Sequence, residues 1–461
     1  MNAIEQLFIE FGNAAWGPWL VILILGSGLY FVFLSRLVPF RYLGHSLALL
    51  SGRYDDDKSP GDITHFQALS SALAGTIGMG NIAGVAVAIG VGGPGAIFWM
   101  WMTALVGVAT KFFTCTLAVM YRGKDSEGHI QGGPMYVITE GLGHRWRPLA
   151  IFFCVAGTIG ALPLFQVNQL VQTLREVIFI EQGWISPAQT FEFNLAAGIA
   201  LATIVGLVIF GGLPRIASVA SELVPTMAVL YLAMTAVVLW LHASELPGYL
   251  LLIVTDAFTG TSVAGGAIGT VIATGVRRGV FSNEAGVGTE AMAHGAARTK
   301  EPVREGLVAM LGPIIDTLVV CTGTALMILV SGVWRSGESD GVTMTAAAVT
   351  ENLPGVGIYV LITCIFFFGI STVFSYSYYG SKCLGFLIGA ERQHYYNYVI
   401  VLMTVVASVL SLDAMVGLID GAFAMMAIPT CLSAVLLAPR VMQAARDYFA
   451  RLDAETARAG D

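Results

Sequence analysis

The chain has 461 residues, of which 56% are hydrophobic and 11% charged, and its mean hydropathy is +0.76. These values exclude an ordinary soluble protein and predict a polytopic protein whose partner is the lipid bilayer. The formal net charge of -7 indicates no nucleic-acid partner, because charge in a membrane protein is informative only loop by loop.

Eleven apolar segments are long enough to be transmembrane helices, so we expect an all-α membrane protein with a single domain over residues 1–461. Residues 16–37 form an extra N-terminal helix, 66–242 a first block of five helices, 249–439 a second, and 440–461 a tail. Within the blocks the predicted spans are 66–91, 95–121, 148–180, 192–212, 217–242, 249–278, 307–333, 355–389, 395–412 and 415–439.

The loops between these spans carry an asymmetric charge. With eleven spans, 20 of the 23 Lys and Arg residues fall on one side, counting Arg277 and Arg278 in the loop after the seventh span. The positive-inside rule therefore predicts an N-terminus outside and a C-terminus in the cytoplasm.

The second span has glycines at its centre, in the sequence LAGTIGMGNIAGVA over residues 73–86. A lipid-facing helix would carry Leu, Ile or Val there, so we interpret the stretch as a broken helix. Unwound backbone at membrane depth is tolerated only where it is buried in protein or lines a cavity, which predicts a binding site. The alternative is a packing face, because Gly80 and Gly84 are spaced four apart.

The seventh span is the second glycine-rich one, with AFTGTSVAGGAIG over residues 257–269. The second and seventh spans begin consecutive blocks of five helices, and an odd number of helices gives the two blocks opposite orientations. Interrupted helices at corresponding positions of inverted halves indicate a secondary transporter of the LeuT-type architecture, a 5+5 inverted repeat.

Four motifs resemble one known family. They are GTIGMGNIAGVAVAI (75–89), GGPMYVI (132–138), RRGVFSNEAGVGTEAMAHGAA (277–297) and SYSYYGSK (375–382). The chain resembles the alanine or glycine:cation symporters. This resemblance implies a LeuT-type core after one extra helix, in the plasma membrane, which is the inner membrane in bacteria. It also implies import of a small neutral amino acid with Na+, or sometimes H+. A transporter of the same fold with a larger amino acid or proton coupling is the alternative.

An amino-acid zwitterion needs partners for its carboxylate and its ammonium. The N–H groups of Gly78, Met79 and Gly80 open the outer half of the broken helix and are suited to the carboxylate. The resemblance implies that carbonyls at 262–266 take the ammonium. The expected substrate-binding residues are Thr76, Gly78, Met79, Gly80, Asn81, Gln166, Phe258, Ser262, Gly265, Gly266 and Tyr376.

Two of these residues have a structural alternative, and one departs from the family. Asn81 is also suited to cap a half-helix, and Gln166 to bond to a neighbouring helix. Tyr376 stands where the family often has Trp, close to the expected side-chain pocket.

The expected Na+ ligands are the carbonyls of Gly75 and Ile77 and the hydroxyls of Ser371 and Thr372. This set is implied by the resemblance, because Ser and Thr in transmembrane helices more often bond to their own backbone. Asp316 is a candidate coupling residue, since intramembrane charge is functional by default.

The remaining motifs concern gating, enzyme activity and channel function. The SNEAG segment (282–286) is interpreted as part of an inner gate rather than of the substrate pocket, and His294 as a solvated loop residue. No H-E-x-x-H or G-x-S-x-G motif occurs, so we expect no enzyme activity and no cofactor besides the coupling ion. A channel would be expected to show a filter loop instead of two interrupted helices.

Overall fold

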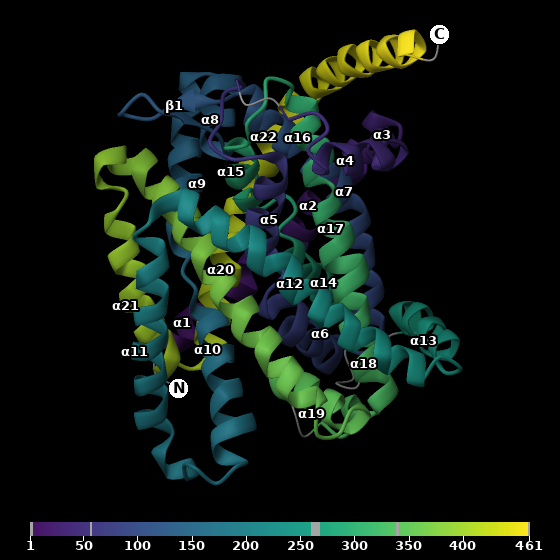
Figure 1. Ribbon diagram of the computed structural model, residues 1–461, viewed down its shortest axis with the longest axis vertical. Helices are drawn as coiled ribbons and strands as arrows, with labels where there is room; N and C mark the ends of the chain where they lie inside the picture. Colours follow the sequence, from purple (N-terminus) through teal and green to yellow (C-terminus); the bar gives the residue numbers. More distant parts are fainter. Residues whose placement is uncertain (1–2, 56–57, 260–267, 338–340, 460–461) are drawn as a thin grey trace.

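The computed structural model describes residues 3–55, 58–259, 268–337 and 341–459. They form a helical bundle, with one hairpin of β1 (Gly123–Lys124) and β2 (Ile130–Gln131) at one end, which we call the hairpin end (Figure 1). Within these ranges, 8 helices are long and apolar enough to cross a membrane, or 9 if one bent pair counts as a span.

Nine of the eleven predicted spans coincide with these described helices. The elements are α2 (Pro18–Ser35), α5 (His65–Thr76) with η1 (Gly80–Gly84) and α6 (Val85–Gly92), α7 (Gly95–Met120), α9 (Arg147–Gly160) with α10 (Leu164–Thr173) and η4 (Leu174–Ile180), α11 (Thr190–Ile209), α12 (Gly212–Leu241), α16 (Pro302–Ala309) with α17 (Leu311–Pro313), η6 (Ile314–Cys321) and α18 (Thr322–Ser331), α20 (Gly357–Ile388), and α22 (Leu412–Ala459). The span predicted at 395–412 corresponds to α21 (Tyr395–Val409), which has 15 residues and is shorter than the helices counted as membrane spans. The count of eleven and the inverted repeat stay predictions.

The second predicted span is interrupted, as expected. α5 ends at Thr76, a bend of 52° follows, and the chain continues as the π-helix η1 and then as α6. The side chains of residues 72–86 are buried, so the stretch faces protein and not lipid. Packing of small residues alone would leave a continuous helix, whereas here the backbone changes direction.

The seventh predicted span differs from expectation. It consists of α13 (Leu246–Thr259), at the side of the bundle, and α14 (Ile268–Asn283), which packs along α7 (Figure 1). The glycine-rich stretch between them lies largely outside the described residues. The described interruption comes later, between α14 and α15 (Thr289–Gly295), where Glu284, Gly286 and Gly288 all have positive φ.

Arg277 and Arg278 lie within α14. Counting them among the residues of the loop after the seventh span was therefore wrong. Both guanidinium groups pair with Asp420 of α22, through a 2.6 Å contact from Arg277 and a close contact from Arg278. Arg278 and Asp420 are buried. A buried charge needs a partner, and this partner is supplied by a helix 142 residues away in sequence.

At the hairpin end, the segment before α5 is joined to the segment after α15. The N–H of Asp62 donates to the carbonyl of Ala296 (2.8 Å), and the N–H of Arg298 donates to that of Ile63 (2.7 Å). Arg122 donates to the carbonyls of Gly295 and Ala297. The start of the first interrupted element and the end of the second are thus tied together here, in a structure that we call the zipper (residues 60–65 and 294–299).

The zipper is completed by a buried carboxylate that bridges two histidines. The two oxygens of Glu305, on α16, each contact one ring nitrogen, Nδ1 of His65 and Nδ1 of His294. All three side chains are 0–1% exposed. His294 is therefore not the solvated loop residue that was expected, because the fold places α16 over it.

We expect Glu305→Gln to destabilise the protein. Glutamine keeps one acceptor oxygen, so one buried histidine loses its partner, at a cost of about 1–3 kcal/mol. Unfolding followed by tryptophan fluorescence in detergent measures the change. The matched control is Glu301→Gln, which breaks an exposed pair with Arg451 and should cost less than about 1 kcal/mol. Equal losses in the two variants would contradict a structural role for the buried bridge.

Candidate functional site

The candidate site is built around the bend between α5 and η1. Asn81 stabilises this bend, because its Oδ1 accepts a hydrogen bond from the N–H of Gly78 (2.9 Å). The alternative reading of Asn81, as a residue that caps the half-helix, therefore describes part of what its side chain does. π-Helical turns such as η1 occur frequently at functional sites.

Glycine is required at the bend because neighbouring helices approach its backbone. A Cβ atom on Gly78 would lie 2.5 Å from Oγ1 of Thr372, and one on Gly75 would lie 3.3 Å from the Tyr379 ring, both on α20. A Cβ on Gly80 would lie 3.4 Å from the ring of Phe281 on α14. The bend is thus enclosed by α20 on one side and by α14 on another.

The two α20 hydroxyls that were predicted to bind Na+ share a hydrogen-bond acceptor but have different neighbours. Thr372 and Ser371 both donate to the carbonyl of Phe368, at 2.9 and 3.1 Å, as the alternative reading expects. This uses the hydroxyl hydrogens and leaves oxygen lone pairs for a cation. Thr372 contacts Gly78, whereas Ser371 lies 3.9 Å from the sulfur of Met227 on α12.

A buried polar cluster joins η1 to α14 and to a second π-helix, η6. The Oδ1 atom of Asp316 accepts from the amide of Asn81 and from the hydroxyl of Ser282 (2.6 Å). The other carboxylate oxygen of Asp316 is buried and has no hydrogen-bond partner within the described structure. Asp316 is thus brought directly to the bend by Asn81.

A second buried carboxylate, that of Glu284, lies between α14 and α15. Its Oε1 accepts a hydrogen bond from the hydroxyl of Tyr376 (2.7 Å), and its Oε2 accepts one from Thr289. Glu284 has a φ of 54°, which is uncommon for a residue with a side chain and is typical of functional sites.

Aromatic rings form the wall next to Gly80. The ring of Phe281 lies 5.2 Å from that of Phe165 and 5.7 Å from that of Phe423, and Phe423 lies 6.4 Å from Tyr376. The guanidinium of Arg278 lies 5.1 Å from the centre of the Phe281 ring. The Arg278–Asp420 pair therefore covers this aromatic wall.

Several polar atoms around the bend lack a partner. Of the ten buried side-chain atoms that are unpaired within the described structure, four belong to Ser71, Thr76, Gln166 and Asp316. Each such atom costs about 1–3 kcal/mol unless something binds it. Gln166 lies in the first turn of α10 and interacts with the Tyr376 side chain. Hydroxyl, amide and carboxylate groups of this kind can hold a zwitterion and a cation.

Most predicted site residues are brought together at the bend, but not all. The residues that gather there are Gly75, Thr76, Ile77, Gly78, Met79, Gly80, Asn81, Gln166, Thr372 and Tyr376. Phe258 is 55% exposed on α13, and is therefore not placed at the site. Ser262, Gly265 and Gly266 lie outside the described residues.

The contribution of α14 and of the segment that follows it was not predicted from the sequence. Ser282 and Glu284 belong to the SNEAG segment, which was assigned to an inner gate and excluded from the pocket, whereas both contact residues around the bend. The glycines at 286 and 288 were the available signal, because positive φ is least costly at glycine.

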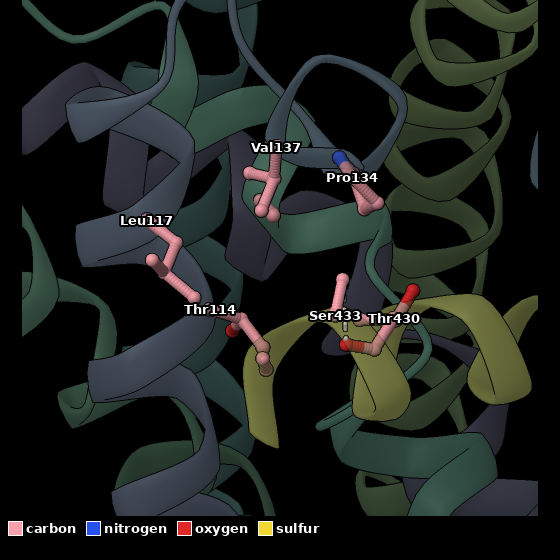
Figure 2. Close-up of a pocket in the computed structure, with 8 residues that line it drawn as sticks. Thr114, Leu117, Pro134, Val137, Thr430 and Ser433 are labelled. Carbon is pink, nitrogen blue, oxygen red and sulfur yellow. Dashed lines mark hydrogen bonds between the residues drawn. The ribbon is translucent and has the colours of Figure 1, made fainter. Parts of the chain in front are cut away.

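A small cavity, separate from the bend, lies closer to the hairpin end than the bend does. It is lined by residues of α7, α15, α22 and the segment 134–137, among them Thr114, Pro134 and Thr430 (Figure 2). Its accessible volume is about 10 Å³, roughly the space that one water molecule needs. It is too small to be the substrate site.

The chain is similar to known proteins over nearly all of its length. The profile described as "Sodium:alanine symporter family" matches residues 1–460. The chain is 38% identical to the sodium/alanine symporter AgcS of Methanococcus maripaludis, over 94% of each chain. It is 35% identical to the probable sodium/glutamine symporter GlnT of Bacillus subtilis, over 97% of this chain and 91% of that one.

A solved structure is similar in fold. The crystal structure of MhsT in complex with L-phenylalanine superposes with a TM-score of 0.58, covering 83% of this chain and 98% of that chain. The two sequences are only 12% identical, so this likeness shows a shared LeuT-type fold and nothing of the ligand.

Proposed function

Because the chain belongs to the sodium:alanine symporter family, we propose that it imports a small neutral amino acid, such as alanine or glycine, with Na+. Family membership makes it an amino-acid transporter and not an enzyme. The proposal rests on the interrupted helix, where Asn81 bonds to both Gly78 and Asp316. Thr76, Gln166 and Asp316 also carry buried polar atoms that are unpaired within the described structure.

The substrate is held with its carboxylate at the start of the outer half-helix. The N–H groups of Met79 and Gly80, at the positive end of this half-helix, bind the carboxylate. The side chain of the substrate faces Phe281, whose ring lies 3.4 Å from where a Cβ atom on Gly80 would stand. This close wall favours a small side chain such as a methyl group.

The coupling ion lies on the opposite side of the bend. The carbonyls of Gly75 and Ile77 and the hydroxyl of Thr372, with Ser371 nearby, form the Na+ site. Asp316 couples ion and substrate through Asn81, because its carboxylate bonds to that amide. The unpaired oxygen of Asp316 favours H+ as the second candidate for the coupling ion.

Transport proceeds by alternating access, with one closure at each end. The Arg278–Asp420 pair and the aromatic wall close the outer side, and the zipper closes the cytoplasmic side. The N-terminus lies outside and the C-terminus in the cytoplasm of a bacterial inner membrane. Opening either side breaks one set of contacts and leaves the other set intact.

Uptake by proteoliposomes tests the function. We expect radiolabelled alanine to accumulate under an inward Na+ gradient, with unlabelled amino acids as competitors and Li+ or choline as replacements. Accumulation under a pH gradient without Na+ would favour proton coupling. Flux that only equilibrates would indicate a channel, and competition by glutamine but not glycine would indicate a larger substrate.

Thr372→Ala is expected to raise the Na+ concentration for half-maximal uptake by about tenfold or more, because one cation ligand is lost. Uptake measured against Na+ concentration gives the shift. Thr363→Ala is the matched control, since Thr363 lies exposed on the same helix and also donates to its own backbone (2.8 Å). An unchanged Na+ response in Thr372→Ala would remove this residue from the ion site.

A further inference from the structure

Glu284 is a buried acid whose partners do not neutralise it. It is 1% exposed, and within the described structure its two oxygens accept from two neutral hydroxyls and from no Lys, Arg or His. The charges that act on it at longer range, Lys111 and Glu290, have opposite signs. A desolvated carboxylate without a paired cation is costly, so its position suggests that a cation arrives from elsewhere.

Glu284 is connected to the bend by the contacts of two neighbouring residues. Ser282, two residues earlier, has its Cα 3.5 Å from where a Cβ on Gly80 would stand. Tyr376, which bonds to Glu284, lies one turn along α20 from Thr372, which contacts Gly78. Glu284 is therefore linked to the bend from two directions, through Ser282 on its own chain segment and through Tyr376 on α20.

Other buried polar atoms near the bend also lack a hydrogen-bond partner within the described structure. Oε1 of Gln166 is buried and unpaired, and the side chain of Gln166 interacts with Tyr376, the partner of Glu284. Oγ1 of Thr76, at the end of α5, is buried and unpaired as well. Both atoms can accept hydrogen bonds, as the Glu284 carboxylate can, and acceptors of this kind suit a group with several N–H donors.

We propose that Glu284 accepts the ammonium group of the substrate, and that Tyr376 and Thr289 are positioning residues that orient its carboxylate. This deepens the proposed function and rests on it. The ligand class is then α-amino acids with a free, protonated amino group, held between the half-helix N–H groups at one end and Glu284 at the other. N-acyl amino acids and simple carboxylic acids are excluded, because they lack the cation.

Direct binding to the detergent-solubilised full chain tests the proposal. Wild type should bind radiolabelled alanine in Na+, with no competition from N-acetylalanine or propionate. Glu284→Gln, which keeps the shape of the side chain, should weaken alanine binding by about 10–100-fold. The stabilisation of this variant by Na+ alone, measured as a shift in unfolding temperature, should remain as in wild type.

Two further variants separate recognition from structure. Tyr376→Phe keeps the Glu284 charge and should weaken binding by only about 3–10-fold. Glu290→Gln removes the neighbouring buried acid, which bonds to Thr114 (3.2 Å), and should leave alanine affinity within about twofold. Unchanged affinity in Glu284→Gln would overturn the proposal while leaving the transporter function intact.

The remaining outcomes are also decisive. If Glu284→Gln loses alanine binding, the Na+ response and thermal stability together, Glu284 is structural and the proposal fails. Competition by N-acetylalanine in wild type would likewise contradict an ammonium site. If wild type binds no amino acid at all, the proposed function itself fails, which is a different result from failure of Glu284→Gln alone.

Discussion

Replacing Gly78 with alanine is expected to lower Na+-driven amino-acid uptake by about one to two orders of magnitude, although only a methyl group is added. The new Cβ would lie 2.5 Å from Oγ1 of Thr372. Thr372 is β-branched and bonded to the Phe368 carbonyl, so it cannot turn away without losing that bond. Overpacking of this kind costs about 1–3 kcal/mol, and here it displaces the bend itself.

Gly84→Ala is the matched control for this prediction. Among the described residues, no atom beyond its chain neighbours and its own helix backbone lies within 4 Å of the added Cβ, so uptake should fall by less than about threefold. Initial uptake rates, normalised to the amount of folded protein in the vesicles, give the comparison. A Gly78→Ala protein that transports as well as Gly84→Ala would show that the approach of α20 to the bend is not needed.

Replacing Asp420 with asparagine is expected to be strongly destabilising and to abolish uptake. Arg278 is 4% exposed and would be left as a buried charge without its ion-pair partner. Removing one partner of a buried pair costs about 3–5 kcal/mol. The loss should appear as a lower unfolding temperature in detergent and as absence of accumulation in proteoliposomes.

Arg277→Gln provides the comparison for Asp420→Asn. Arg277 is 21% exposed and shares the same carboxylate, so its removal leaves the buried Arg278–Asp420 pair in place. We expect a loss of less than about 1 kcal/mol and near-normal uptake. If the two variants are equally stable, the Arg278–Asp420 pair does not hold α14 against α22.

Nine of the membrane spans and the first bend were predicted correctly from the sequence, because both depend on residues that are neighbours in the chain. The long apolar runs predicted nine spans that coincide with described helices, because hydropathy over about 20 residues is a local property. The glycines of residues 73–86 predicted the bend for the same reason, since backbone freedom depends on each residue alone.

The interruption between α14 and α15 was not predicted. Glycine content favoured residues 257–269, of which 260–267 lie outside the described residues, and the break after Asn283 was not singled out. The conformation of the segment after Asn283 also depends on contacts from other helices, such as the bond from Tyr376 to Glu284. Local composition cannot reveal a bond between residues 92 positions apart.

The sequence by itself determined that this chain lies in a membrane, that it belongs with a family of symporters, and that its second span bends at glycines. Only the tertiary structure decided which charges are buried and what they face. Arg278 meets Asp420, His294 meets Glu305, and Asn81 meets Asp316. The physical reason is that a charged or polar side chain is stable inside the protein only beside its partner, and distant helices supply these partners.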